Sequence, residues 1–441
     1  MIPATEFLVS GEGFPNSALK DGGVMKRWKK VALVLLLLAA PLSQTPFIYR
    51  RYTLGRLQAS INSLNAQHAP ANIDDPYIDY KGVMHVHSHL GGHSTGTFDE
   101  LIAAAKSNQL SFVVMTEHPA RHVDTMEATL KGTHDGVLFI NGSELNPVAS
   151  DRLLIVPGMR PVESTDASAT QQAIDHAKRD GNLAFVAYPE QRRSWDVSGY
   201  DGIEVYNLYT NTKQISYARL LLDGLWSYSS YPELLFATFY QRPHGNLKRW
   251  DELMVAGNRP LIAIAGNDAH SNVGLSLQHL TGEKILQLKL DPYERSFRIV
   301  RMHVLVERGR QALSTGVNTG VSTEVILAAL ARGHCFIGFD LFGDTSGFRF
   351  TAHNGAGRSV ILGDQIEMTQ GAAVRLSVTT PVPARMVFFR NGGVIYEERE
   401  ATRKELIVTE RGAYRVEIYL DQLGELLRDR PWIISNPIFV K

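Results

Sequence analysis

The stretch GVMHVHSHLGGHSTGTFDELIAAAKSNQ, residues 82–109, decides the fold that we expect for this chain. Residues 82–89 are typical of a buried strand, and residues 97–109 place their apolar side chains on one face of a helix. Thr97 and Glu100 have the spacing of a capping box, which predicts that the helix begins just after Thr97. The stretch therefore predicts a strand, a glycine-rich loop and a helix, the repeating unit of an α/β fold.

Short apolar runs and helical segments continue to alternate up to about residue 340. We expect further strands at residues 111–118, 136–145, 152–158, 182–189, 202–207, 261–270 and 334–340. Further helices are expected at residues 166–180 and 322–332, with a largely helical, aromatic-rich insertion at about residues 208–260. Because the strands are nearly continuous apolar runs, this pattern favours a parallel α/β sheet or barrel.

The apolar pattern changes to a period of two in the last hundred residues, as at residues 374–380 and 414–420. Asn391-Gly392-Gly393 lies between two strand-like runs and predicts a hairpin. We therefore expect an α/β domain at residues 80–342 and a small all-β sandwich domain at residues 343–441.

The N-terminal region has the pattern of an export signal. Residues 1–24 are polar and Gly-rich, and we interpret them as a disordered segment or an overextended start. In residues 25–50, basic residues precede a run of 19 residues without charge, Val31–Tyr49. This pattern fits a secretory signal peptide or an uncleaved membrane anchor, with a buried core helix as the alternative. We expect residues 51–79 to be a linker and the rest to be extracytoplasmic, either periplasmic or secreted.

Composition excludes several classes of protein. Hydrophobic residues make up 44% of the chain and charged residues 20%, which is enough apolar material for a packed core. The 45 basic and 45 acidic residues balance, which argues against a dedicated nucleic-acid binder. Cys335 is the single cysteine, so the chain has neither an intramolecular disulfide nor a thiolate zinc cluster. Any metal site must therefore be built from imidazole and carboxylate groups.

Histidines and carboxylates stand at the ends of four predicted strands. His85 and His87 are two residues apart, so a regular strand would place both on one face; scattered surface histidines are the alternative for this pair alone. The carboxyl ends of strands are where α/β barrels carry their active-site groups. His89 and His122 remain undecided. The candidate metal ligands are His85, His87, His93, His118, Glu144, Asp268 and His270.

Imidazole and carboxylate ligands suit a catalytic zinc, manganese or iron site. The candidates outnumber the ligands of one tetrahedral ion, so we expect two divalent metal ions that share a bridging carboxylate. Paired metals lower the pKa of a bound water and stabilise the attacking and leaving oxygens of a displacement. The residues therefore predict hydrolytic chemistry.

The ordered series HVHSHLGGHSTGTFDEL, TEH, GSE, AYP, EVYN and GNDAH resembles the PHP (polymerase and histidinol phosphatase) superfamily of metallohydrolases. The C-terminal part, with WIISNPIFV near its end, is similar to the branch that includes carbaryl-hydrolase-like enzymes. The resemblance covers residues 80–441 and implies a distorted seven-stranded α/β barrel. It also implies two sets of ligands with Glu144 as the bridge: His85, His87, Glu144 and Asp268 for one metal, and His93, His118 and His270 for another.

Arg152 and Tyr188 stand where this family usually has two histidines, which puts a third metal in doubt. An arginine at this position can bind a phosphate or another oxyanion. A tyrosine can donate to the leaving oxygen or to the developing charge. We therefore treat both as candidate catalytic residues, with structural replacement in a degenerate site as the alternative.

The expected function is a metal-dependent phosphoesterase that uses a metal-bound hydroxide on a small, anionic ester. The same site also fits a carboxylic or carbamate ester, and a non-catalytic metal- or ligand-binding surface protein is the alternative of another class. We expect no nucleic-acid partner, and the N-terminal segment is a candidate membrane anchor. Among nearby residues, we expect Glu117 to support a ligand, Arg192 and Arg193 to be a solvated loop pair, and Cys335 to be a small buried hydrophobe.

Overall fold

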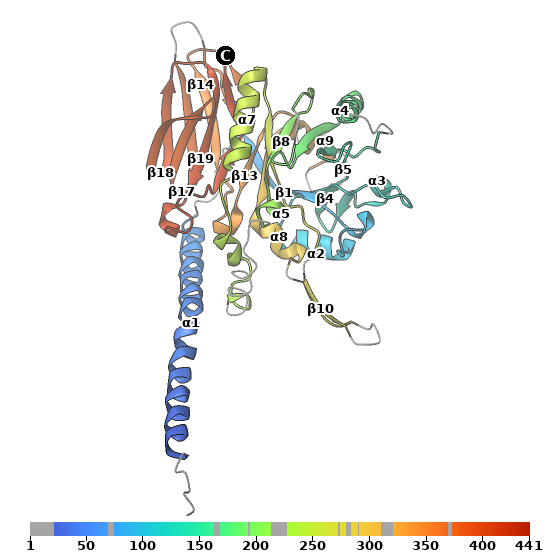
Figure 1. Cartoon of the computed structure of the whole chain (residues 1–441). Helices are drawn as coiled ribbons and strands as arrows, with labels where there is room; N and C mark the ends of the chain where they lie inside the picture. Colours follow the sequence, from blue (N-terminus) through green and yellow to red (C-terminus); the bar gives the residue numbers. More distant parts are fainter. Residues whose placement is uncertain are drawn as a thin grey trace, which may run out of the picture.

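The computed structural model describes residues 22–441 except 69–74, 163–167, 193–194, 213–226, 272–273, 279–283, 290, 310–320 and 369–372. Most of the expected N-terminal extension, Arg193 and part of the expected insertion therefore lie outside the described residues. The described part contains a mixed α/β domain, a β domain and one long helix that projects from them (Figure 1).

Two sheets build the α/β domain. The first contains β1 (Tyr77–Val86), β2 (Phe112–Met115), β3 (Gly132–His134), β4 (Val137–Ile140), β12 (Arg301–Glu307) and β13 (Cys335–Gly338). The second contains β5 (Ser143–Leu145), β6 (Arg152–Val156), β7 (Leu183–Ala187), β8 (Gly202–Asn207) and β9 (Ile262–Gly266) in that order. A separate hairpin follows β9 and consists of β10 (Gly274–Gln278) and β11 (Lys284–Lys289).

The expected parallel arrangement holds for only some of the strand pairs. β1 and β2, β2 and β4, β7 and β8, and β8 and β9 are parallel, whereas β1 and β12, β5 and β6, and β6 and β7 are antiparallel. Within the described residues, two isolated bridges join the sheets, Val86 to Ala269 and Glu117 to Ser143. The sheets are not closed, so a seven-stranded barrel is not shown. Apolar runs mark buried strands but carry no information on their direction.

Helices connect and cover these strands. The helix after the first strand is confirmed as α2 (Phe98–Ser107), and Thr97 and Glu100 form the predicted capping box. The described part of the expected insertion contains α5 (Leu208–Thr212), η2 (Leu234–Thr238) and α7 (His244–Gly257), and both α5 and α7 contact β8. The other helical elements are η1 (His89–Gly91), α3 (Thr125–Ala128), α4 (Ala169–Arg179), α8 (Tyr293–Ile299), α9 (Thr323–Ala331) and η4 (Asp340–Phe342).

The β domain has strands throughout, with a 3-10 turn, η5 (Asp421–Leu423). The predicted hairpin is confirmed, because Arg390 pairs with Gly393 across a turn in which Asn391 and Gly392 have φ values of 49° and 82°. Pairing of β13 with β20 makes one 14-stranded sheet run through both domains. The strands are β14 (Arg349–Asn354), β15 (Ser359–Ile361), β16 (Gln365–Ile366), β17 (Val374–Arg390), β18 (Gly393–Val408), β19 (Gly412–Tyr419), β20 (Ile433–Ser435) and β21 (Ile438–Val440).

Buried charges join the two domains. Arg415 of β19 donates to both carboxylate oxygens of Asp251 in α7, at 2.9 and 2.8 Å, and to Glu417 at 2.6 Å. The Arg415 side chain is only 2% exposed. Arg242 also donates to Glu417. Because each buried carboxylate has a guanidinium partner, removal of one partner would leave an uncompensated charge in the interior.

A second buried charge cluster surrounds His303 of β12. Its Nδ1 lies 2.8 Å from the Asp79 carboxylate and its Nε2 lies 3.3 Å from the Asp340 carboxylate. Burial lowers the pKa of His303, but the two carboxylates outweigh this effect and raise it to about 9. His303 is therefore charged at neutral pH and links β1 to η4.

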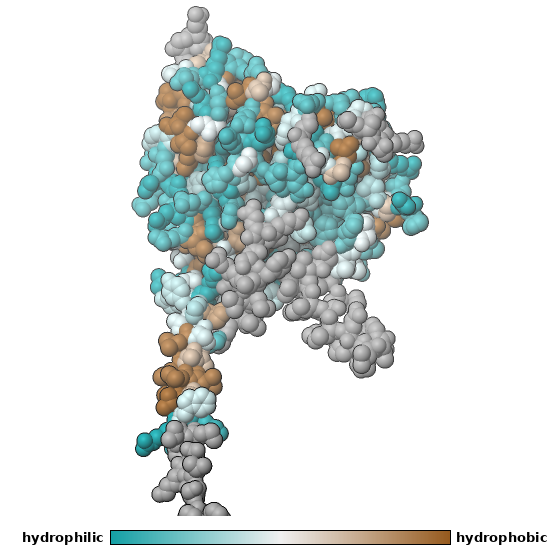
Figure 2. Space-filling view, viewed as in Figure 1, coloured by the Kyte–Doolittle hydropathy of each residue, from teal (hydrophilic) through white to brown (hydrophobic). Residues whose placement is uncertain are grey.

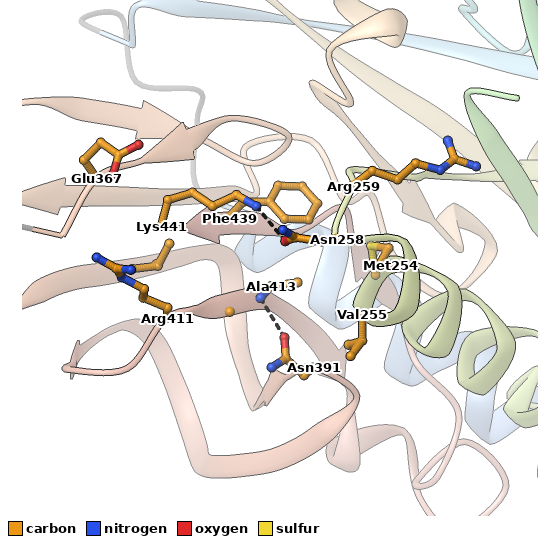
Figure 3. A pocket seen from close by; sticks show the side chains of 12 residues that line it. Met254, Val255, Asn258, Arg259, Glu367, Asn391, Arg411, Ala413, Phe439 and Lys441 are labelled. Atoms are coloured by element: carbon orange, nitrogen blue, oxygen red, sulfur yellow. Dashed lines mark hydrogen bonds between the residues drawn. The ribbon is translucent and has the colours of Figure 1, made fainter. Parts of the chain in front are cut away.

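A cavity of about 450 Å³ lies between α7 and the β domain (Figure 3). Its lining includes Met254, Arg411 and Phe439, and Lys441 donates to Asn258 at its edge. None of the predicted metal ligands lines this cavity. The chemistry predicted from the sequence therefore lies elsewhere.

The long helix α1 (Gly22–Gln67) corrects the expected linker at residues 51–79, because it is helical as far as Gln67 and β1 begins at Tyr77. Leu54, Leu57, Ile61 and Leu64 are buried, and their helical spacing places one face of α1 against the body. The preceding apolar segment is exposed and stands clear of the body (Figure 2). It is long and apolar enough to cross a membrane, and none of its most apolar window is buried.

Candidate metal centre

Two isolated bridges bring the predicted strand ends together. The bridge between Val86 and Ala269 places His85 and His87 beside Asp268, with His87 N donating to Ala269 O at 3.1 Å. The bridge between Glu117 and Ser143 brings Glu144 to the end of β2, with Glu144 N donating to Glu117 O at 3.1 Å. Residues that are far apart in the chain therefore meet at one place.

His85, His87, Glu144 and Asp268 form a compact, buried group, as the resemblance implied for the first metal. Glu144 Oε2 lies 3.1 Å from His85 Nε2 and 3.2 Å from His87 Nε2. Asp268 Oδ1 lies 3.5 Å from each of these two nitrogens. Two imidazole nitrogens and two carboxylate oxygens therefore converge on one point.

Several of these converging atoms have no hydrogen-bond partner. Both ring nitrogens of His87 and the Oδ1 atom of Asp268 are buried and make no hydrogen bond, although His87 Nε2 lies 3.2 Å from Glu144 Oε2. Burying a polar atom without a partner costs about 1–3 kcal/mol. A cation held between these atoms removes that cost, and neutral imidazole with carboxylate is a donor set that zinc, manganese and iron accept. The residues present thus fit a divalent metal ion.

A second group contains His87, His118 and His270. Glu144 Oε2 is also 3.5 Å from His118 Nε2, so this carboxylate contacts both groups, as the predicted bridging ligand should. His93 belongs to neither group, although its ring centroid lies 5.2 Å from that of His118 at the exposed edge. His89 turns away, with Nδ1 3.3 Å from Gly96 O.

Glu204 is a site residue that the sequence analysis did not single out. Its Oε1 atom lies 2.6 Å from His85 Nδ1, and both side chains are fully buried. With Nδ1–H donating to Glu204, the lone pair of His85 Nε2 faces Glu144 and Asp268, which is the tautomer that a metal ligand needs. Gly266 makes room for this pair, because a Cβ atom there would lie 1.7 Å from Glu204 Oε1. The available signals were the acidic residue in EVYN and the glycine that ends β9.

Three residues of the centre have left-handed backbone conformations. The φ values of His85, Tyr188 and Asp268 are 63°, 47° and 48°. Such conformations are unfavourable for residues with a Cβ atom and persist where the surrounding structure imposes them. His85 lies where the pairing of β1 with β2 shifts register, so the two histidines converge through a bulge rather than through regular alternation.

The carboxylates favour positive charge at the centre of the cluster. Burial lowers the pKa of His87, but Asp268 and Glu144 outweigh it and raise this pKa to about 9. Burial and the neighbouring His87 lower the pKa values of His118 and His270 to about 4. The carboxylates thus favour a positive charge, either a proton or a metal ion, at the inner histidine, while the outer two are neutral imidazoles, the form that binds metal.

The structure places both predicted catalytic residues at this cluster. Tyr188 is buried, and its hydroxyl donates to Asp268 Oδ2. Burial, and then the Asp268 charge, raise the pKa of Tyr188, so the hydroxyl keeps its proton. Arg152 Nε lies 3.5 Å from Glu144 Oε1, and its side chain is 30% exposed. Arg152 therefore lies on the open side of the centre and Tyr188 on the closed side.

No family model matches the chain, and no curated protein matches it. Among solved structures it is similar to a two-domain protein from Bacteroides vulgatus that contains a predicted PHP-like metal-dependent phosphoesterase. The identity is 15%, the match covers 84% of this chain and 98% of that chain, and the TM-score is 0.37. A TM-score this low does not establish a common fold, so the chemistry of the centre rests on its own residues.

Glu117 supports the chain beside the cluster, and two other residues considered in the sequence are buried. Glu117 accepts from Ser88 N at 3.1 Å and from Thr129 Oγ1 at 2.9 Å, which fixes the chain just after His87. Arg192 is not solvated, since its guanidinium is buried and lies 3.2 Å from Asp151. Cys335 is buried, as expected, and burial raises the pKa of its thiol to about 12.

Proposed function

We propose that this chain is a metal-dependent hydrolase, and most specifically a phosphoesterase that acts on a small anionic ester. The observation that carries the proposal is the buried convergence of His85, His87, Glu144 and Asp268, in which His87 and one oxygen of Asp268 make no hydrogen bond. Structural metal sites in proteins are closed by their ligands, whereas catalytic sites keep an open side. Here the outer histidines remain partly exposed, at 19% for the His118 side chain and 16% for the His270 side chain.

Two divalent ions, zinc, manganese or iron, are the cofactors that we propose. The inner ion would be held by the four buried residues, and the outer ion by His118 and His270 with His93 from the rim, while Glu144 contacts both. When bound, such a pair lowers the pKa of a coordinated water and neutralises charge on the oxygens of the ester.

The protein's own residues orient the ligands and the substrate. Glu204 fixes the tautomer of His85, and Tyr188 fixes the orientation of the Asp268 carboxylate. Arg152 is the cation beside Glu144 on the open side, where its guanidinium fork can hold two oxygens of a phosphate. When a phosphate oxygen binds the Arg152 guanidinium, it replaces Glu144 as the partner of that guanidinium. The Glu144 carboxylate would then be free to bind the metal ions. This arrangement favours a phosphoester over an uncharged ester.

Family and location are part of the proposal. The motif series supports membership of the PHP superfamily, with its distorted seven-stranded barrel, and the C-terminal β domain supports the carbaryl-hydrolase-like branch. The exposed apolar segment of α1, with basic residues on both sides, supports an extracytoplasmic protein that is anchored in a membrane.

Metal quantification with a small substrate panel tests the proposal. The purified full chain should hold about two transition-metal ions and should hydrolyse a phosphomonoester faster than a carbamate ester. Arg152→Ala should raise KM for the phosphomonoester much more than for a carboxylic ester. The reverse substrate preference would support the ester-hydrolase alternative. Less than one ion per chain and no hydrolysis would support a binding protein with a degenerate site.

A further inference from the structure

We propose that the substrate phosphate is carried by a lipid in the same bilayer that holds α1, and that the metal centre opens toward the head groups of that bilayer. This inference rests on the proposed hydrolytic function and adds the class and the position of the substrate. It is carried by α1, by the segment between α1 and the centre, and by the exposed apolar residues at the rim.

The apolar segment of α1 has the dimensions of a membrane span. Val31–Tyr49 has 19 residues without charge. At a rise of about 1.5 Å per residue, this segment is about 28 Å long as a helix, which is close to the thickness of the hydrocarbon core of a bilayer. Basic residues lie at both ends, at positions 26–30 and 50–51. The side chains of residues 31–38 are exposed in the chain by itself. A bilayer with anionic head groups complements both the apolar surface and the basic ends.

The body begins where this span ends, without a spacer. Arg51, at the boundary, donates to Ser230 Oγ at 2.8 Å. Leu54 is buried one turn later, and a Cβ atom on Gly55 would lie 2.9 Å from the hydroxyl of Tyr231. Because α1 is one continuous helix from Gly22 to Gln67, the contacts of its second half hold the body at head-group level.

The segment that contacts α1 also borders the metal centre. Residues 227–241 include Ser230, Tyr231 and η2, which contacts α1. The same segment holds α5, because Asn211 Nδ2 donates to Phe239 O at 3.2 Å and Gln241 N donates to Asn211 Oδ1 at 3.3 Å. Tyr209 of α5 has its ring centroid 6.5 Å from that of His270. One layer of chain therefore separates the anchor from the rim of the centre.

A hairpin that follows the centre in the chain lies at the same end of the body as the anchor. In Figure 1, the β10–β11 hairpin, which starts four residues after His270, leaves the lower end of the body, the end from which α1 also projects. Tyr209, after β8, is 44% exposed, and Val123, on the loop after His118, is 39% exposed. An exposed aromatic side chain on α5 and an exposed apolar side chain on the loop after His118 are suited to the boundary between head groups and acyl chains.

The reaction would release phosphate from the lipid. Water forms a bond to phosphorus, the P–O bond to the lipid oxygen breaks, and that oxygen takes up a proton and leaves as the lipid alcohol. The second proton of the water stays with the phosphate. Water is the single co-reactant. The alcohol remains in the bilayer, and phosphate leaves through the open side past Arg152.

The test compares substrate in the same bilayer with substrate in a different one. The metal-loaded full chain is reconstituted in phosphatidylcholine vesicles, and phosphatidic acid is placed either in those vesicles or in separate vesicles. Confinement to one bilayer raises the effective concentration, so phosphate release should be at least about tenfold faster when enzyme and lipid share vesicles. Hydrolysis of soluble p-nitrophenyl phosphate should be the same in both preparations.

A matched variant tests the rigid coupling. A flexible Gly/Ser insertion between Tyr49 and Arg50 keeps the span and the body intact but frees one from the other. It should lower the rate on lipid in shared vesicles severalfold and leave the soluble rate unchanged. Equal rates with shared and separate lipid, or hydrolysis of the soluble ester alone, would overturn the inference and leave the proposed function standing. Loss of hydrolysis of both substrates by the metal-loaded chain would instead overturn the proposed function.

Discussion

Gly266→Ala is the substitution that most directly probes how the centre is supported. The new Cβ atom would lie 1.7 Å from Glu204 Oε1 and 2.9 Å from His85 Cβ. The carboxylate must therefore move, and the 2.6 Å contact with His85 Nδ1 is lost. His85 then loses the partner that fixes its tautomer and ring orientation, while the four ligand side chains keep their identity.

The metal affinity should fall by about 10- to 100-fold, the usual cost of removing a group that orients a metal ligand. This loss corresponds to about 1.4–2.7 kcal/mol of binding free energy. Overpacking should also lower the free energy of unfolding by about 1–3 kcal/mol. A competitive chelator titration measures the first quantity and urea unfolding the second. The control is Gly245→Ala in α7, where a Cβ atom meets nothing within 4 Å. Wild-type metal affinity in folded Gly266→Ala would refute the supporting role of Glu204.

Three further substitutions test the domain junction, the buried histidine and the centre. Arg415→Met leaves Asp251 buried without its guanidinium partner, while Glu417 keeps Arg242. It should lower the free energy of unfolding in urea by about 3–5 kcal/mol. The exposed pair lost in the control Arg403→Met should cost at most about 1 kcal/mol, and equal costs would contradict the account. The pKa of His303 in the folded protein, about 9, lies above its value in the unfolded chain. The charged histidine therefore stabilises the fold fully below about pH 6.5, and this contribution is lost as the pH rises through about 9. His303→Gln should remove the fall in the free energy of unfolding over this range, which urea unfolding at several pH values measures. Tyr188→Phe removes the hydroxyl that donates to the Asp268 carboxylate. It should lower kcat about 10- to 100-fold while the metal content is retained. An unchanged kcat would show that the hydrogen bond from Tyr188 to Asp268 is dispensable.

Much of the centre could be predicted from the sequence, because strand ends that carry histidine or carboxylate are a local signal. His85 and His87 do converge, although through a bulge rather than through the expected alternation, and Glu144 and Asp268 complete the inner group. Glu204 was missed because its role depends on a contact with His85 across 119 residues. Nor could the bulge at His85 be foreseen, since pairing with β2 and the bridge to Ala269 impose it.

The fold was predicted less completely. The apolar runs identified buried strands, but antiparallel pairing of β6 with both neighbours is set by connections that periodicity does not record. The helical spacing of Leu54, Leu57, Ile61 and Leu64 was a readable signal that residues 51–67 form a packed helix rather than a linker. Arg192 is buried because Asp151, from a different loop, neutralises it, and no local pattern indicates such a pair.

The most direct test of the account is the metal content of the full chain, measured by elemental analysis beside that of Asp268→Ala. Asp268 lies 3.5 Å from both inner imidazole nitrogens and has an unpaired buried oxygen. The account predicts about two divalent transition-metal ions in the wild-type chain and at least one fewer in Asp268→Ala, with loss of hydrolysis. Less than one tightly bound ion in the wild-type chain, or equal metal content in the two proteins, would contradict it.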